Sequence, residues 1–317
     1  MTSTIVDAAI CLLLVSAGAV TLVTVPDSGG AGAAADVAGE RPAGDDADRA
    51  DALATTLTAA TASVNYTLAP GARRASGTRV AFPHTEGPQF ERTSRGTLAG
   101  LLADAALAGV RVDGTRLDHT GDDFRRGVRA RTLEAVGANA QVVAVWRPTP
   151  EGPIEGRVVV GPDPPADQSV HASVVRVATA FEGVGHSATA TTGDAPSGEP
   201  AVGEKRERLA HSVATAVVTG LLPPAETRFA LAGDYPVTAL TRHRYHRLAG
   251  LLGVDLHGSI AADPAASNVT RATQLLTEGL SDRVAETLRR SGASTDEIES
   301  DLAVGRVRIT VRTWGAS

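Results

Sequence analysis

Cysteine, lysine and aromatic residues are scarce in this chain of 317 residues. Cys11 is the only cysteine and Lys205 is the only lysine. A single cysteine excludes an intramolecular disulfide and a multi-cysteine metal site. Aromatic residues make up 3% of the chain and apolar residues 43%, so we expect a core packed mainly from valine, leucine and alanine.

The charge is mildly negative and unevenly placed. The formal net charge is −6, and almost every basic residue is arginine. Between Asp27 and Asp51 there are seven acidic residues against only Arg41 and Arg49. Nucleic-acid-binding domains carry a clustered basic surface, and this composition offers none. We therefore expect no nucleic-acid partner, and a body close to neutral behind an acidic segment.

One long apolar run covers residues 5–25, "IVDAAICLLLVSAGAVTLVTV". A helix of about 21 residues at about 1.5 Å per residue crosses the roughly 30 Å hydrocarbon core of a bilayer. Asp7 is the only formal charge in the run, and it lies in the first turn. There its carboxylate can stay at the membrane interface, near the positive end of the helix dipole. We favour a retained membrane anchor, with Asp7 as its interfacial carboxylate.

Two other interpretations of the run stay open. The small residues "AGAAA" at 31–35 are compatible with a cleaved secretory signal, although the segment before the run lacks the usual basic residue. A pilin-like helix that packs in a bundle is the third interpretation. The very short N-terminal tail favours a body outside the cell.

Two candidate N-glycosylation sequences support the same orientation. "NYT" begins at Asn65 and "NVT" at Asn268, and Asn139 is the only other asparagine. Such acceptor sequences are modified on secreted or extracytoplasmic surfaces. The prediction is a single-pass protein of the cell membrane with an extracellular body.

Composition divides the chain into three parts. Residues 1–26 form the anchor, and residues 27–51 form an acidic stalk rich in alanine and glycine that cannot bury a core. Residues 52–317 form the body, which the Gly/Ser/Thr/Pro-rich loop at 182–204 could divide into two halves.

Several segments of the body have strand character. The β-rich runs cover residues 141–147, 156–161 and 169–181. The clearest strand is 305–314, "GRVRITVRTW", in which apolar residues alternate with arginines. Such alternation is typical of a strand with one face on a core and one in water.

Helical patterns are equally present, at residues 93–109, 204–222, 263–290 and 294–303. Asp263 is a plausible N-cap followed by Pro264 at the first helical position, and Ser294 with Glu297 fits a capping box. Because strands and helices do not alternate regularly, we predict an α+β fold, in which the N-terminal transmembrane helix precedes a body with a mostly antiparallel sheet and several helices.

Few motifs point to chemistry. "GHSAT" around Ser187 is similar to the Gly-x-Ser-x-Gly nucleophile elbow of α/β-hydrolases, but a threonine replaces the second glycine. His243 and His246 lie three residues apart, with Asp255 and His257 nearby, a spacing that a metal site can use. The surrounding arginines would repel a cation.

The remaining charged residues favour surface roles. Arg242, Arg244 and Arg247 predict the basic edge of a helix, solvated or in contact with a partner. Asp122 and Asp123 fit the charged N-terminus of a helix, since adjacent carboxylates on a helix point in different directions. The sequence contains no phosphate-binding loop and no dinucleotide-binding turn. We expect no catalytic residue, no metal and no cofactor.

The arginine-for-lysine usage, the run "STIVDAAICLLLVSAGAVTLVTVP", the acidic stalk and "GPDPP" at 161–165 resemble a haloarchaeal family of uncharacterised membrane-anchored surface proteins. Members of that family are similar to products encoded beside archaeal type IV pilus or secretion components. The resemblance implies a pilin-like surface component whose apolar helix packs in a bundle. Unlike pilins, this chain has no basic leader before the run.

Together these features predict a non-enzymatic, single-pass surface protein that contacts membrane lipid through residues 5–25. Its expected partners are other envelope or pilus-system proteins, with which it would serve as an assembly or structural component. The alternative hypothesis is a membrane-tethered hydrolase built around Ser187 or around the histidines 243 and 246.

Overall fold

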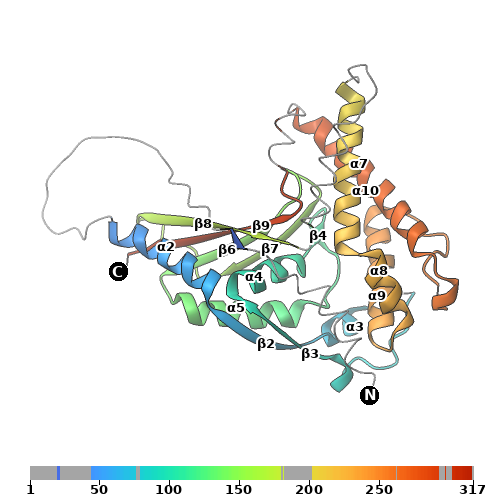
Figure 1. Cartoon of the computed structure of the whole chain (residues 1–317), viewed down its shortest axis with the longest axis horizontal. Helices are drawn as coiled ribbons and strands as arrows, with labels where there is room; N and C mark the ends of the chain where they lie inside the picture. Colours follow the sequence, from blue (N-terminus) through green and yellow to red (C-terminus); the bar gives the residue numbers. More distant parts are fainter. Residues whose placement is uncertain are drawn as a thin grey trace, which may run out of the picture.

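The computed structural model shows an antiparallel sheet covered on one face by helices, with a separate group of helices beside it (Figure 1). The structure describes residues 20–21, 44–75, 79–179, 181, 202–261, 263–292, 297 and 302–315. This arrangement confirms the predicted α+β class.

Within the described residues the main sheet has seven strands, and all of its pairs are antiparallel, which agrees with the predicted mostly antiparallel sheet. Their order across the sheet is β1 (Val20–Thr21), β8 (Val170–Ala178), β9 (Arg306–Trp314), β6 (Ala140–Trp146), β7 (Ile154–Val160), β4 (Arg111–Val112) and β5 (Thr115–Arg116).

Strand β9 joins the two ends of the body. Its alternation places Val307, Ile309 and Val311 in the core with no exposed surface, as the sequence predicts. It pairs with β8 on one side and β6 on the other. The expected halves on either side of the 182–204 loop therefore share one sheet, and residues from both contribute to the same core cluster.

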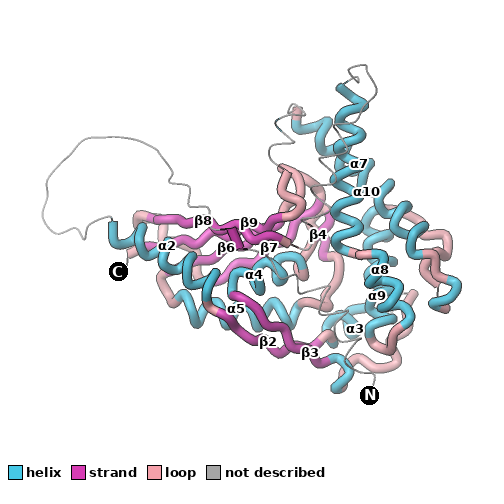
Figure 2. The backbone as a smooth tube through the Cα atoms, viewed as in Figure 1, coloured by secondary structure: helices cyan, strands magenta, loops and turns pink. Residues whose placement is uncertain are grey.

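The inner face of the sheet is covered by α2 (Gly44–Ala59), α4 (Leu98–Leu107) and α5 (Asp122–Val136). Below these helices lies an antiparallel ribbon of β2 (Thr61–Thr67) and β3 (Glu91–Thr97), as Figure 2 shows. The helix α3 (Ala69–Ala75) and the 3₁₀ turn η1 (Pro88–Phe90) connect the two strands of the ribbon.

The second group consists of α7 (Val202–Leu221), α8 (Pro224–Ala232), α9 (Val237–Leu252) and α10 (Val269–Ser291), with the 3₁₀ turn η3 (Pro264–Ala266) before α10. Helices α7 and α10 lie side by side (Figure 1). The predicted apolar face of α10 is buried: Leu276, Leu280, Val284 and Leu288 are all at most 3% exposed.

Two predicted boundaries are wrong. Asp263 does not cap the long helix, because its carboxylate accepts a hydrogen bond from Ala265 N within η3. Asn268 is the N-cap of α10, and its Oδ1 accepts from Arg271 N at 2.9 Å. The acidic stalk does not extend to Asp51, because α2 begins at Gly44 and Ala50 is only 1% exposed. Alanines favour this helix, and aspartates are favourable in its first turn.

Most of the apolar run lies outside the described residues, together with Asp7, Cys11, Ser187 and the 31–35 segment. Val20 and Thr21 are described, and they form strand β1 opposite Val177 and Arg176 of β8. At these two residues the structure differs from the expected helix, because the open edge of β8 offers backbone hydrogen bonds. Within the described ranges, no helix combines the length and apolar character needed to cross a bilayer.

Asp104 is an acidic residue in the buried helix α4. It is 9% exposed, and its neighbours along the helix from Leu101 to Ala106 are all buried. This burial raises the pKa of the Asp104 carboxyl to about 8, because a low-dielectric environment disfavours the charged form. Asp104 is therefore largely protonated at neutral pH.

Asp104→Asn should stabilise the protein at high pH. The native carboxyl binds its proton more tightly than the unfolded one, so the wild type loses stability as pH rises from about 4 to about 8. At pH 8 the variant should be more stable by on the order of 5 kcal/mol, and near pH 4 the difference should nearly vanish. Urea unfolding at both pH values measures this, with the exposed Asp48→Asn as control. Equal differences at both pH values would contradict the assignment.

Candidate functional site

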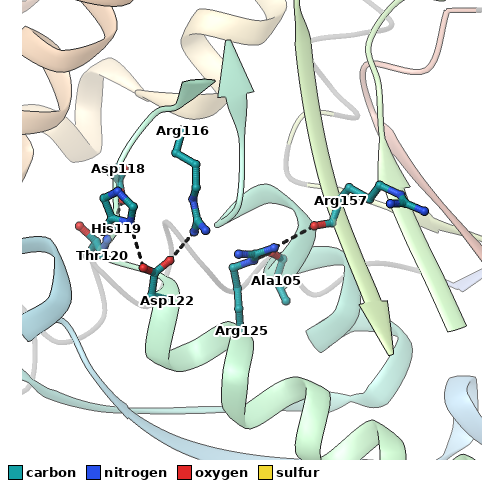
Figure 3. Close-up of polar contacts among 8 residues, drawn as sticks. All are labelled: Ala105, Arg116, Asp118, His119, Thr120, Asp122, Arg125 and Arg157. Carbon is teal, nitrogen blue, oxygen red and sulfur yellow. Dashed lines mark hydrogen bonds and ion pairs between the residues drawn. The ribbon is translucent and has the colours of Figure 1, made fainter. Parts of the chain in front are cut away.

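A group of hydrogen-bonded and ion-paired side chains lies where β5, the 117–121 loop and the start of α5 meet helix α9. Figure 3 shows its core, in which Asp122 lies between His119 and Arg116. We call this group the polar junction; it consists of Arg116, Asp118, His119, Asp122, Arg244 and Arg247.

Asp122 is the centre of the junction. Asp122 is the first residue of α5, so its carboxylate lies at the positive end of the helix dipole. One oxygen accepts a hydrogen bond from the Arg116 guanidinium, and the other lies 2.9 Å from His119 Nδ1. The side chains of Asp122 and Arg116 are only 20% and 17% exposed. Partly buried charges of this kind need each other as partners.

The 117–121 loop before Asp122 is fixed both by a side chain buried in the core and by a hydrogen bond within the loop. Leu117 is 1% exposed in the core, while the Asp118 carboxylate accepts a hydrogen bond from Thr120 N at 2.8 Å. Gly121, the residue before α5, has no room for a side chain: a Cβ there would lie 2.6 Å from the Cβ of Ala108. A glycine thus lets α5 begin directly against the end of α4.

Helix α9 reaches the junction through two of the arginines that the sequence suggested for a partner. Arg244 Nε lies 3.3 Å from Asp118 Oδ2 in a partly buried ion pair, and Arg247 donates to the Arg116 carbonyl oxygen at 3.4 Å. Arg242 forms neither of these contacts. The arginine edge therefore faces the chain itself at two of its three positions.

The predicted helix N-terminus at residues 122–123 is confirmed, and its two carboxylates serve different elements. The Asp123 carboxylate accepts a hydrogen bond from Thr67 N at 2.9 Å, at the end of β2, and pairs with Arg126 at 2.6 Å. Adjacent carboxylates thus point apart, as helix geometry requires, and they cannot act as an acid–base pair.

Arg125 extends the junction toward the sheet. Its Nε donates to the Ala105 carbonyl oxygen at 3.2 Å and its Nη2 to the Arg157 carbonyl oxygen at 2.9 Å (Figure 3). Burial, and then the positive charge of Arg116, lower the pKa of the Arg125 guanidinium to about 10. Arg125 stays charged at neutral pH and links α5 to the last turn of α4 and to β7.

The histidines of α9 do not form the metal site that their spacing allows. His243 is 8% exposed and its ring packs edge-on against Phe82, at 6.1 Å between ring centroids. Burial lowers the pKa of both His243 and His246. Asp255 and His257 lie beyond the end of α9 and are largely exposed. Among the described residues, no three histidine, cysteine or acidic side chains come close enough together to hold a metal ion.

The His119–Asp122 contact resembles two members of a catalytic triad, in which a carboxylate orients an imidazole. A triad also needs a nucleophile next to the imidazole. Ser187 lies outside the described residues, so the hydrolase built around Ser187 stays a prediction. The contacts that the structure does show join secondary-structure elements, which is the work of a structural network.

The candidate glycosylation sites lie on two different elements. Asn65 is an exposed residue of β2 and accepts a hydrogen bond from Thr93 at 2.8 Å. Asn268 is exposed at the N-terminus of α10, and Thr270 of the same acceptor sequence accepts a hydrogen bond from Arg228 at 3.0 Å. Modification of either asparagine stays a prediction.

Sequence reasoning missed the partners of Asp122. Arg116 and His119 lie within six residues of it, and this clustering of opposite charges was the available signal. The contact to α9 had no sequence signal, because Asp118 and Arg244 are separated by more than a hundred residues.

A family model described as a family of unknown function, DUF7284, matches residues 6–314. No curated protein and no solved structure matches the chain.

Asp122→Asn should destabilise the fold by about 2 kcal/mol, because it leaves the partly buried Arg116 guanidinium without its carboxylate. The control is Glu134→Gln on the same helix, whose exposed pair with Arg131 should contribute no more than about 0.5 kcal/mol. The free energy of unfolding in urea measures both. An equal effect of the two substitutions would contradict the structural importance of the junction.

Proposed function

The chain belongs to the DUF7284 family, and we propose that it is a non-enzymatic, single-pass protein of the cell membrane with an extracellular body. In this proposal it serves as an assembly or structural component of an archaeal envelope system of the pilus or secretion type. The observation that carries the proposal is the apolar run at residues 5–25, which holds one charged residue and precedes a folded α+β body.

The contacts in the body support a structural role. Asp122, Asp118 and Asp123 each bind residues of other elements, so these three carboxylates help to hold β2, β5, α5 and α9 together. The resemblance to membrane-anchored haloarchaeal proteins favours the same role. It also favours partners among other envelope or pilus-system proteins.

Membrane anchoring should depend on the centre of the apolar run. Val15→Arg places a charge at the middle of the expected span, where it costs about 2.5–3.5 kcal/mol of insertion free energy. Ser3→Arg adds the same charge outside the run and should have no effect. We expect the wild type and Ser3→Arg to stay in the membrane pellet after alkaline carbonate extraction, whereas Val15→Arg is released in part. Release of the wild type would contradict the anchor.

The assembly-component and hydrolase hypotheses predict different effects of Ser187→Ala. If the protein is an assembly component, its deletion should remove or alter surface appendages, and Ser187→Ala should restore them as fully as the wild-type gene does. Electron microscopy of the cell surface provides the measurement. A deletion phenotype that wild type rescues and Ser187→Ala does not would favour the hydrolase.

A further inference from the structure

The outer face of the main sheet, opposite the helices, carries a group of arginines. Arg176, Arg308 and Arg157 lie in one row across β8, β9 and β7, with Val145 of β6 between the last two. The row spans three strand spacings, roughly 14 Å. Along β9 the arginines continue on the same face. We call these residues the arginine face: Arg157, Arg176, Arg306, Arg308 and Arg312.

This face lies away from the covered side of the sheet. Helices α2, α4 and α5 all lie on the other side (Figure 1). In Figure 3 the Arg157 side chain points away from Arg125, although its backbone oxygen accepts the Arg125 hydrogen bond. Four of the five arginines are exposed and Arg176 is half-buried.

The arginines have no acidic partners among the described residues. No carboxylate of the described chain forms an ion pair with any of the five. Arg176 lies directly opposite Arg308, and like charges in directly opposed positions of a sheet are unfavourable. Positions at which a sequence departs from such a pairing preference are often functional. The unbalanced positive charge points to an anionic ligand outside the fold.

The residues between the arginines narrow the class of ligand. Valines 145, 159 and 174 occupy partly exposed outward positions on β6, β7 and β8, and the face has no exposed aromatic ring on which a nucleic-acid base could stack. Guanidinium groups bind phosphate through two parallel hydrogen bonds. A flat face of arginines and small apolar side chains therefore fits the headgroup region of a bilayer.

We propose that the arginine face binds the phosphate groups of anionic membrane lipids, which lays the sheet of the anchored protein against its own membrane. This inference rests on the proposed membrane anchoring.

The test uses the full chain with Cys11→Ser and one new labelling site, in nanodiscs of phosphatidylcholine alone or with one-third phosphatidylglycerol. Ala172→Cys places the label on the arginine face, opposite Arg312. Ala130→Cys is the control, exposed on α5 on the other side of the molecule. We expect anionic lipid to slow maleimide labelling severalfold at position 172 and not at 130. Arg176→Gln with Arg308→Gln should abolish the slowing.

The outcomes separate this inference from the anchor. If the chain co-elutes with both kinds of nanodisc but labelling at position 172 is the same on both, the lipid contact is wrong and the anchor stands. If it co-elutes only with anionic nanodiscs, the anchor is wrong and the arginine face is supported. If a single-stranded oligonucleotide or added protein slows labelling and lipid does not, the lipid assignment is overturned. Circular dichroism of each variant confirms that it is folded.

Discussion

The start of helix α5 is the constraint on which much of the body depends. Two adjacent aspartates there point in different directions, and each holds a different element. Asp122 binds Arg116 and His119, which fixes the turn after β5. Asp123 binds the backbone at the end of β2. Because carboxylates that are only about one-fifth exposed are costly without partners, this one point of the chain sets the positions of the sheet edge, the ribbon and α5 together.

The same region connects the sheet to the second group of helices. Asp118 and the Arg116 backbone receive Arg244 and Arg247 from α9, and β9 returns from that group to the middle of the sheet. The first link, to α9, is polar, and the second is the buried strand β9. Two sets of charges in the body thus differ: those of the polar junction are paired inside the fold, and the arginines of the outer sheet face form no ion pair with a carboxylate of the described chain.

Periodicity explains which parts of the fold were predictable. Strands β6, β7, β8 and β9 and helix α7 have clear apolar patterns and were predicted close to their observed bounds. Helices α4 and α10 were also predicted from their apolar patterns, but their starts were placed five and six residues too early, at 93 and 263. The ribbon was missed because β2 and β3 are rich in Thr, Ser and Arg, and only Val64, Tyr66 and Ser94 are buried in them. For the site, residues 122–123 were recognised as a helix start. Their partners were not, since pairing with α9 is decided by tertiary packing.

Native-state hydrogen exchange is the measurement that tests most directly whether the polar junction holds the body as one unit. The amides of the 116–121 loop and those of α9 should exchange through a common opening, with the same free energy and the same dependence on denaturant, because Asp118 and Arg116 tie the two segments together. If α9 opens at a clearly lower free energy while the loop stays protected, the junction does not couple them and the account is wrong.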